Sequence, residues 1–105
     1  MIQVKIKRKD NKIINIRVSG HAKSDEYGKD LVCAGVSTAC VGIANALVNY
    51  DFLQYGSITL NEGLCEIEVN RNSETFQIVL EVFETILETI EESYHEYINI
   101  MKMEV

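Results

Sequence analysis

The sequence predicts an α+β domain with the element order ββαββα, in which a mainly antiparallel four-stranded sheet packs against two helices. Hydrophobic and polar residues alternate along residues 2–18 and 57–69, as they do in strands that bury one face. Apolar residues are instead continuous along residues 33–52 and recur at three-and-four spacing along residues 74–101, which indicates helices. Two hairpins and two helices of this kind form an α+β sandwich.

The length and composition are those of a single soluble domain. The chain has 105 residues, of which 47% are hydrophobic and 25% charged, with no proline and no Gly/Ser tract that would join two domains. We expect one domain over residues 1–105. We also expect no membrane-spanning segment, which needs a run of roughly 18 apolar residues, and no signal peptide at the charged start. The expected location is therefore the cytoplasm.

The first hairpin covers residues 2–19, and its turn is the polar segment of residues 9–12. The residues expected to face the core from its two strands are Ile2, Val4, Ile6, Ile14, Ile16 and Val18. Residues 21–32 follow neither period. They are expected to form a long loop of the kind that often carries function.

The first helix is expected to begin at Cys33 and to continue to about Phe52. It is almost uncharged and apolar on nearly every side, which predicts that it lies between the sheet and another layer. Gly35 and Gly42 lie on one face of this helix and lower its helix propensity. They predict close packing there against a neighbour or a ligand.

The second hairpin pairs residues 57–60 with residues 64–69. The last helix is expected to be capped by Asn72 or Ser73 and to run to about Met101. Its outer face is expected to be solvated and strongly acidic, and the alternative is that it attracts a basic partner. The glutamates of this face are Glu74, Glu81, Glu84, Glu88, Glu91, Glu92 and Glu96.

The net charge of −6 divides unevenly along the chain. Residues 1–30 contain eight basic and four acidic residues, whereas residues 31–105 contain two basic and twelve acidic ones. A solvated sheet face is the preferred interpretation of the basic hairpin, and we expect no direct contact with nucleic acid. The basic side chains concerned are Lys5, Lys7, Arg8, Lys9, Lys12 and Arg17.

Reactive side chains gather between residues 20 and 37. Cys33 stands at the predicted helix start, where free N–H groups and the helix dipole stabilise a thiolate and an oxyanion. His21 lies 12 residues earlier, and the loop is expected to bring its imidazole back to form a Cys/His pair with Cys33. We expect Asp30 to orient His21 or to keep it protonated, and Ser37, one turn beyond Cys33, to reach the sulfur or the reacting group.

The three cysteines differ in their surroundings. Their number is odd and their spacing contains no CxxC pair, so we expect reduced thiols, no metal and no cofactor. Cys40 and Cys65 fall among apolar residues and are expected to be core side chains. The alternative for Cys33 and His21, as for any lone Cys and His in a small domain, is a structural or incidental role.

The segments Gly-His-Ala at residues 20–22 and Asp-x-Val-Cys-Ala-Gly-Val-Ser at residues 30–37 resemble the ribosomal-processing cysteine protease family of bacteria, often called Prp. The resemblance extends to the length, the element order and the acidic last helix. It implies a cysteine endopeptidase that removes a short N-terminal extension from the twenty-seventh protein of the large ribosomal subunit. It also implies His21 as the general base and Cys33 as the nucleophile, with Asp30 and Ser37 in support.

The same resemblance implies a homodimer and a mobile loop between the histidine and the cysteine. Gly20 and Gly28 are the expected hinges of that loop. Two other functions are carried as alternatives. One is a non-catalytic ribosome-assembly factor that binds a basic partner through the acidic helix, and the other is a thiol redox sensor.

Overall fold

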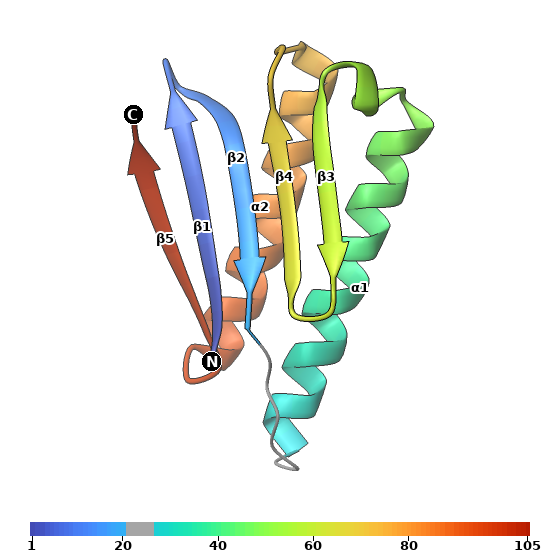
Figure 1. The fold of residues 1–105 in the computed structure, drawn as a ribbon. Coiled ribbons are helices and arrows are strands. Elements are labelled where there is room, and N and C mark those ends of the chain that lie inside the picture. Colours follow the sequence, from blue (N-terminus) through green and yellow to red (C-terminus); the bar gives the residue numbers. More distant parts are fainter. Residues whose placement is uncertain (21–26) are drawn as a thin grey trace.

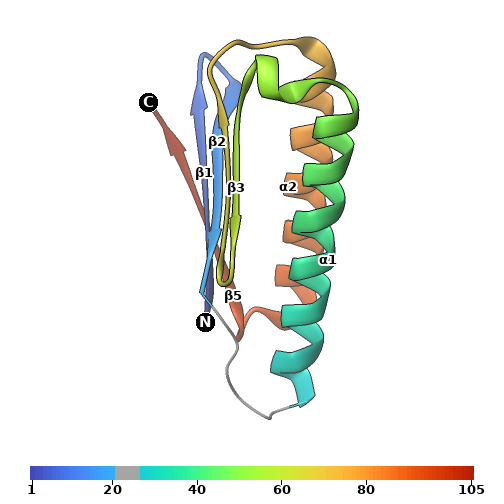
Figure 2. The same cartoon turned by 45° about the vertical axis from the view of Figure 1, so that its right-hand side comes forward.

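The computed structural model describes the backbone of residues 1–20 and 27–105 and the side chains of residues 1–20 and 31–105. These residues form a five-stranded sheet with two helices packed on one face (Figures 1 and 2). The elements are β1 (Ile2–Lys9), β2 (Lys12–Ser19), α1 (Tyr27–Asn49), a short 3-10 helix (Phe52–Gln54), β3 (Gly56–Asn61), β4 (Leu64–Val69), α2 (Glu74–Tyr94) and β5 (Ile98–Glu104).

The predicted α+β class is confirmed, with one more strand than expected. The strand order is β3-β4-β2-β1-β5. The pairs β1–β2, β2–β4 and β3–β4 are antiparallel, whereas β5 is parallel to β1. Ser73 caps α2, as one of the two predicted caps, because its hydroxyl accepts a hydrogen bond of 3.3 Å from the N–H of Phe76.

The prediction that the last helix reaches Met101 was wrong. The helix ends at Tyr94, and the chain returns along β1 as β5, with Ile98 opposite Ile2 and Ile100 opposite Val4. The apolar residues of the tail fit both a helical and a period-two spacing. The strand prevails because β-branched isoleucines favour a sheet and because β5 satisfies the outer backbone groups of β1.

The first helix also has different bounds from those predicted. It begins at Tyr27, six residues before Cys33, and it ends at Asn49. Asp51 then adopts a left-handed conformation with φ of 63°, which breaks the helix and places Phe52 in the core. The Phe52 ring meets the edge of Phe76, with the ring centroids 5.0 Å apart.

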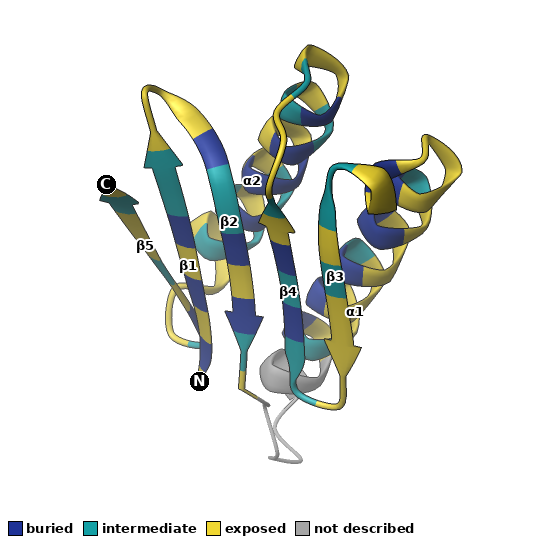
Figure 3. Cartoon of the chain, turned by 45° about the horizontal axis from the view of Figure 1, so that its top comes forward, coloured by how far each residue is buried: buried dark blue, intermediate teal, exposed yellow. Residues whose placement is uncertain are grey.

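A β-bulge makes one of the predicted inward residues of the first hairpin wrong. Lys7 lies opposite Asn15, but Arg8 lies opposite Ile13, so the register shifts between Lys7 and Arg8. Because of this extra residue, Ile13 is fully buried and Ile14 is only half-buried. The other five predicted core residues of the hairpin are buried, and Figure 3 shows buried and exposed residues alternating along β1.

Arg8 lies on the core side of the sheet and not among the solvated basic residues, because it continues the period-two alternation of the buried β1 residues. Its guanidinium donates hydrogen bonds of 2.9 Å and 2.6 Å to the two carboxylate oxygens of Glu84. Glu84 is only 5% exposed, so the prediction that it is solvated was wrong. The hydrogen bonds from Arg8 hold the pKa of Glu84 below its usual range, against the opposing effect of burial.

Helix α1 is more apolar than expected of a chain without a membrane segment. Its part Leu31–Asn49 has a mean hydropathy of 2.0 and is long enough to cross a membrane by length and composition, which contradicts the expectation of no such run. One face of the helix belongs to the core of this fold. The buried residues of that face are Val32, Val36, Cys40, Ile43, Ala44 and Leu47.

Candidate functional site

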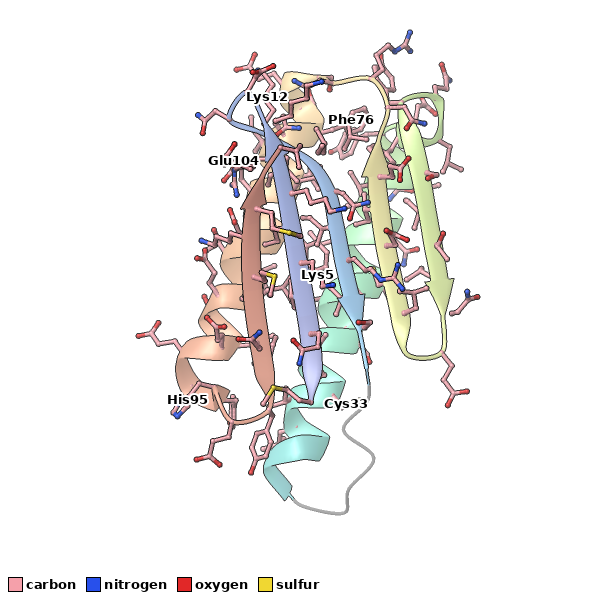
Figure 4. The ribbon with its side chains drawn as sticks, turned by 60° about the vertical axis from the view of Figure 1, so that its left-hand side comes forward. Lys5, Lys12, Cys33, Phe76, His95 and Glu104 are labelled. Atoms are coloured by element: carbon pink, nitrogen blue, oxygen red, sulfur yellow. The ribbon has the colours of Figure 1, made fainter. Side chains whose placement is uncertain are left out.

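Cys33 and Ser37 line a cavity of about 230 Å³ between α1 and one end of the sheet. Figure 4 shows Cys33 on α1 at the end of the molecule where β1 begins. Most of the cavity wall is apolar, and it combines the starts and ends of several strands with one face of α1. The remaining lining residues are Ile2, Val18, Gly20, Val36, Cys40, Val41, Leu60, Asn61, Glu62, Gly63, Leu64 and Cys65.

The cavity leaves the Cys33 side chain partly accessible. Cys33 is half-buried, whereas Cys40 and Cys65 are each only 5% exposed. A half-buried thiol can meet a substrate that enters the cavity and is also held by its neighbours. This accessibility fits a nucleophile better than a core side chain.

Cys33 is not at the helix start, which corrects the predicted oxyanion site. Because α1 begins at Tyr27, the N–H of Cys33 lies in the second turn and is used within the helix. The unpaired donors of α1 belong to its first four residues. The helix N-terminus therefore neither lies beside the Cys33 sulfur nor supplies the predicted oxyanion donors in this conformation.

The other predicted site residues are resolved to different extents. His21 lies outside the described residues. Asp30 lies on α1, three residues before Cys33, but its side chain is outside the description. Ser37 is exposed, stands one turn beyond Cys33 as predicted and lines the same cavity. Gly28 lies in the first turn of α1 and not in a loop, so its role as a hinge stays a prediction.

Cys40 and Cys65 are core residues, as predicted, and their side chains meet at the inner wall of the cavity. The hydrogen bond between the two thiols, together with burial, raises the pKa of Cys40. Cys40 therefore stays protonated at neutral pH. Of the three cysteines, Cys33 is the one with the access that a nucleophile needs.

Nothing in the sequence indicates that the β3–β4 turn forms part of the cavity wall. Asn61, Glu62 and Gly63 line it although they lie about 30 residues from Cys33 in the sequence. The N–H of Gly20 donates a hydrogen bond of 3.0 Å to the carbonyl of Gly63, which holds the turn against the end of β2. A hairpin turn has no sequence feature that says which distant helix it meets, so only the assembled sheet reveals this contact.

Two features of the backbone at the predicted hinge Gly20 exclude a side chain. Its φ is +101°, a conformation that side chains with a Cβ rarely adopt. A Cβ at this position would lie 2.6 Å from the carbonyl oxygen of Met1, where two strand ends approach each other. Glycine is required here for both reasons, whether or not the residue also acts as a hinge.

Gly20→Ala is expected to lower the free energy of unfolding by about 2–3 kcal/mol, because it combines an unfavourable φ with a backbone clash. The matched control is Gly35→Ala, whose Cβ would lie 3.8 Å from the Cδ1 of Ile90, an ordinary contact distance. As a helical glycine, Gly35 should give a change from zero to about 1 kcal/mol of stabilisation. Urea unfolding measures both variants, and equal stability of the two would contradict this account of Gly20.

Gly35 and Gly42 do not pack as closely as the sequence predicts. Besides the ordinary Ile90 contact of Gly35, a Cβ at Gly42 would meet nothing within 4 Å in the described chain. The α1 face around Gly42 is therefore open. In residues 1–20 and 31–105, no three His, Cys, Asp or Glu side chains come together as ligands for a metal ion.

Comparison with known proteins connects this chain to a family. The family model described as Cysteine protease Prp matches residues 1–99. The chain is similar to the ribosomal processing cysteine protease Prp of Staphylococcus aureus, at 35% identity over 95% of this chain and 97% of that protein. It is also similar to the protein of the same description from Bacillus subtilis, at 45% identity over 46% of this chain and 44% of that protein.

Solved structures share the whole fold. SMU.848 from Streptococcus mutans has a TM-score of 0.85 and 28% identity, covering 100% of this chain and 96% of the other. The S. aureus protease Prp in complex with a substrate peptide has a TM-score of 0.84 and 32% identity, covering 97% and 99%. The same protease with a covalently linked product peptide has a TM-score of 0.82 and 34% identity, with the same coverage. The chain therefore belongs to the cysteine protease Prp family.

Proposed function

We propose that this protein is a cysteine endopeptidase that removes the N-terminal extension of a large-subunit ribosomal protein, the twenty-seventh, and so supports ribosome assembly in the cytoplasm. The observation that carries the proposal is the half-buried Cys33 thiol, which lines a cavity in a chain of the cysteine protease Prp family. The S. aureus relative, solved with a substrate peptide and with a covalently linked product peptide, supports nucleophilic catalysis.

The proposed reaction uses a Cys/His dyad. The Cys33 Sγ attacks the scissile carbonyl carbon after His21 accepts the thiol proton, and an S–C bond forms. The C–N bond then breaks as His21 returns the proton to the leaving amine. Water attacks the thioester, which releases the carboxylic acid and restores the thiol. Asp30 orients His21 in this proposal, and the Ser37 hydroxyl supports the reacting group from one turn along α1.

The direct test is incubation of the purified protein with the ribosomal precursor from the same genome. Mass spectrometry of the product should show one new N-terminus at the end of the extension. An uncleaved precursor that still binds at low salt would favour the alternative of a non-catalytic assembly factor. An uncleaved precursor together with reversible oxidation of Cys33 would favour the redox sensor.

We further propose that the protein is a homodimer through the open face of α1. Leu31 and Val48 on this face are 43% and 47% exposed, and no described residue lies within 4 Å of a Cβ placed at Gly42. A second copy would cover an apolar surface that is otherwise in contact with water. Light scattering should give twice the chain mass of 11.9 kDa for the wild type and the single mass for Val48→Glu. A monomeric wild type would contradict the proposal.

A further inference from the structure

The two edges of the sheet differ in how their backbone groups are satisfied. In the order β3-β4-β2-β1-β5, the edge strands are β3 and β5. An edge strand presents unpaired N–H and C=O groups along its outer side, and these can pair with a further extended chain. Proteins therefore cover such edges, unless an edge serves to bind a peptide.

The β5 edge is blocked by side chains of α2. The outward N–H of Ile100 donates a hydrogen bond of 2.8 Å to the Glu91 carboxylate. The Lys102 ammonium donates one of 2.7 Å to Glu88 and lies 3.7 Å from Glu84. The Glu91 carboxylate thus occupies an outward N–H of this edge and the Lys102–Glu88 pair lies beside it, so an added strand would have to displace Glu91.

The β3 edge is open. Asn61 and Leu64 lie on either side of a two-residue turn, so these two residues form a hydrogen-bonded pair. Hydrogen-bonded and non-hydrogen-bonded pairs then alternate along the hairpin. The N–H of Asn70 donates a hydrogen bond of 2.8 Å to the Tyr55 carbonyl, which agrees with this alternation of pairs. The backbone groups of Ile58 and Leu60 therefore point outward. Within the described part of the chain, no hydrogen bond reaches their N–H groups.

The open edge leads directly to the cavity that contains Cys33. Leu60 and Asn61, at the end of β3, line the same cavity as Cys33 and Ser37. Leu60 is 45% exposed and Val41 of α1, which also lines the cavity, is 48% exposed, so the cavity mouth is apolar. A peptide that extends along β3 would reach the thiol at the end of that strand.

We propose that the substrate peptide binds by adding a strand to the outer edge of β3, with its backbone paired to Ile58 and Leu60. This inference rests on the proposed function, since the occupant is the peptide that the protease cleaves. Backbone pairing supplies affinity and orients the chain, and side chains on the helix side of the added strand enter the cavity. The open β3 edge thereby positions the scissile bond near Cys33.

Amide hydrogen exchange, followed by NMR, tests the pairing directly. The probe is a peptide that spans the extension and the cut, added to the Cys33→Ala variant so that it is not cleaved. We expect exchange at the Ile58 and Leu60 amides to slow at least tenfold. The Lys102 amide, on the β5 edge, is the matched control and should not change. Unchanged exchange at Ile58 and Leu60 in the saturated complex would overturn the proposal.

A series of N-methylated substrates tests the same pairing from the side of the peptide. Successive residues of a strand direct their N–H groups to opposite sides, so only every second N–H of the peptide would pair with β3. Methylation of one of these nitrogens should lower kcat/KM about tenfold, and methylation of a nitrogen between them should have little effect. A loss of kcat/KM that does not alternate along the peptide would overturn the proposal.

Cleavage of the parent peptide shows that the proposed function holds even where the β3 pairing fails. Concentration-dependent protection of Ile58 and Leu60 without peptide would instead identify a second copy of the chain on this edge, which also overturns it.

Discussion

Cys33→Ala is expected to reduce the rate of precursor cleavage at least about a thousandfold, because the variant lacks the sulfur atom that forms the covalent bond in the proposed reaction. Loss of the nucleophile leaves only the residual contribution of substrate binding to the rate. Cys33 is half-buried, so the change should have little effect on folding. Mass spectrometry of the product under single-turnover conditions measures the loss, and circular dichroism confirms the fold.

Cys65→Ala is the matched control for the catalytic prediction. Cys65 lines the same cavity but is 5% exposed and contacts Cys40, so its replacement changes packing and removes no accessible thiol. Cleavage by this variant should stay within about tenfold of the wild type, with a loss of stability of about 1 kcal/mol. The nucleophile is assigned incorrectly if Cys65→Ala is inactive while folded, or if Cys33→Ala still cleaves.

Glu84→Gln is expected to lower the free energy of unfolding by about 3 kcal/mol. The substitution leaves the Arg8 guanidinium, whose side chain is only 16% exposed, without its two-point partner. Glu81 stays within 3.1 Å of Arg8 but is half exposed, so it replaces little of the lost interaction. Urea unfolding at neutral pH measures the difference.

Glu92→Gln is the control for this effect, since Glu92 is exposed on the same helix and should change stability by no more than about 0.5 kcal/mol. The pH dependence gives a second criterion. The pKa of Glu84 is lowered in the folded state, so the contribution of the pair is complete above the unfolded pKa of about 4.3. It is lost as the pH falls through the folded pKa, and the gap between wild type and Glu84→Gln should narrow there. A gap that widens on acidification would contradict the assignment.

Most elements of the fold follow from local patterns in the sequence. The hairpins, the helical segments and the Ser73 cap all have signals within a few residues, because a strand, a helix or a cap is specified by neighbouring side chains. The errors occurred where two local interpretations were equally good. The tail after Tyr94 suits a helix or a strand, and only its pairing with β1 decides between them.

The pairing of Arg8 with Glu84 shows a second reason why the sequence did not predict part of the structure. Arg8 is in phase with the buried residues of β1, so its inward position was readable from the alternation. Its charge favoured the solvated interpretation instead. A buried charge is tolerated only with a partner, and that partner is 76 residues away on α2. The pairing therefore could not be recognised before the helix was placed on the sheet.

The sequence alone determined the α+β class and the assignment of Cys40 and Cys65 to the core, and it predicted a reactive segment around Cys33. These follow from composition, periodicity and short motifs, which depend on residues near one another along the chain. Only the tertiary structure decided that Cys33 lies inside α1, that the β3–β4 turn completes its cavity and that β3 is the open edge of the sheet. Those properties arise from contacts between segments distant in sequence, because which strand becomes an edge depends on how every other strand is paired.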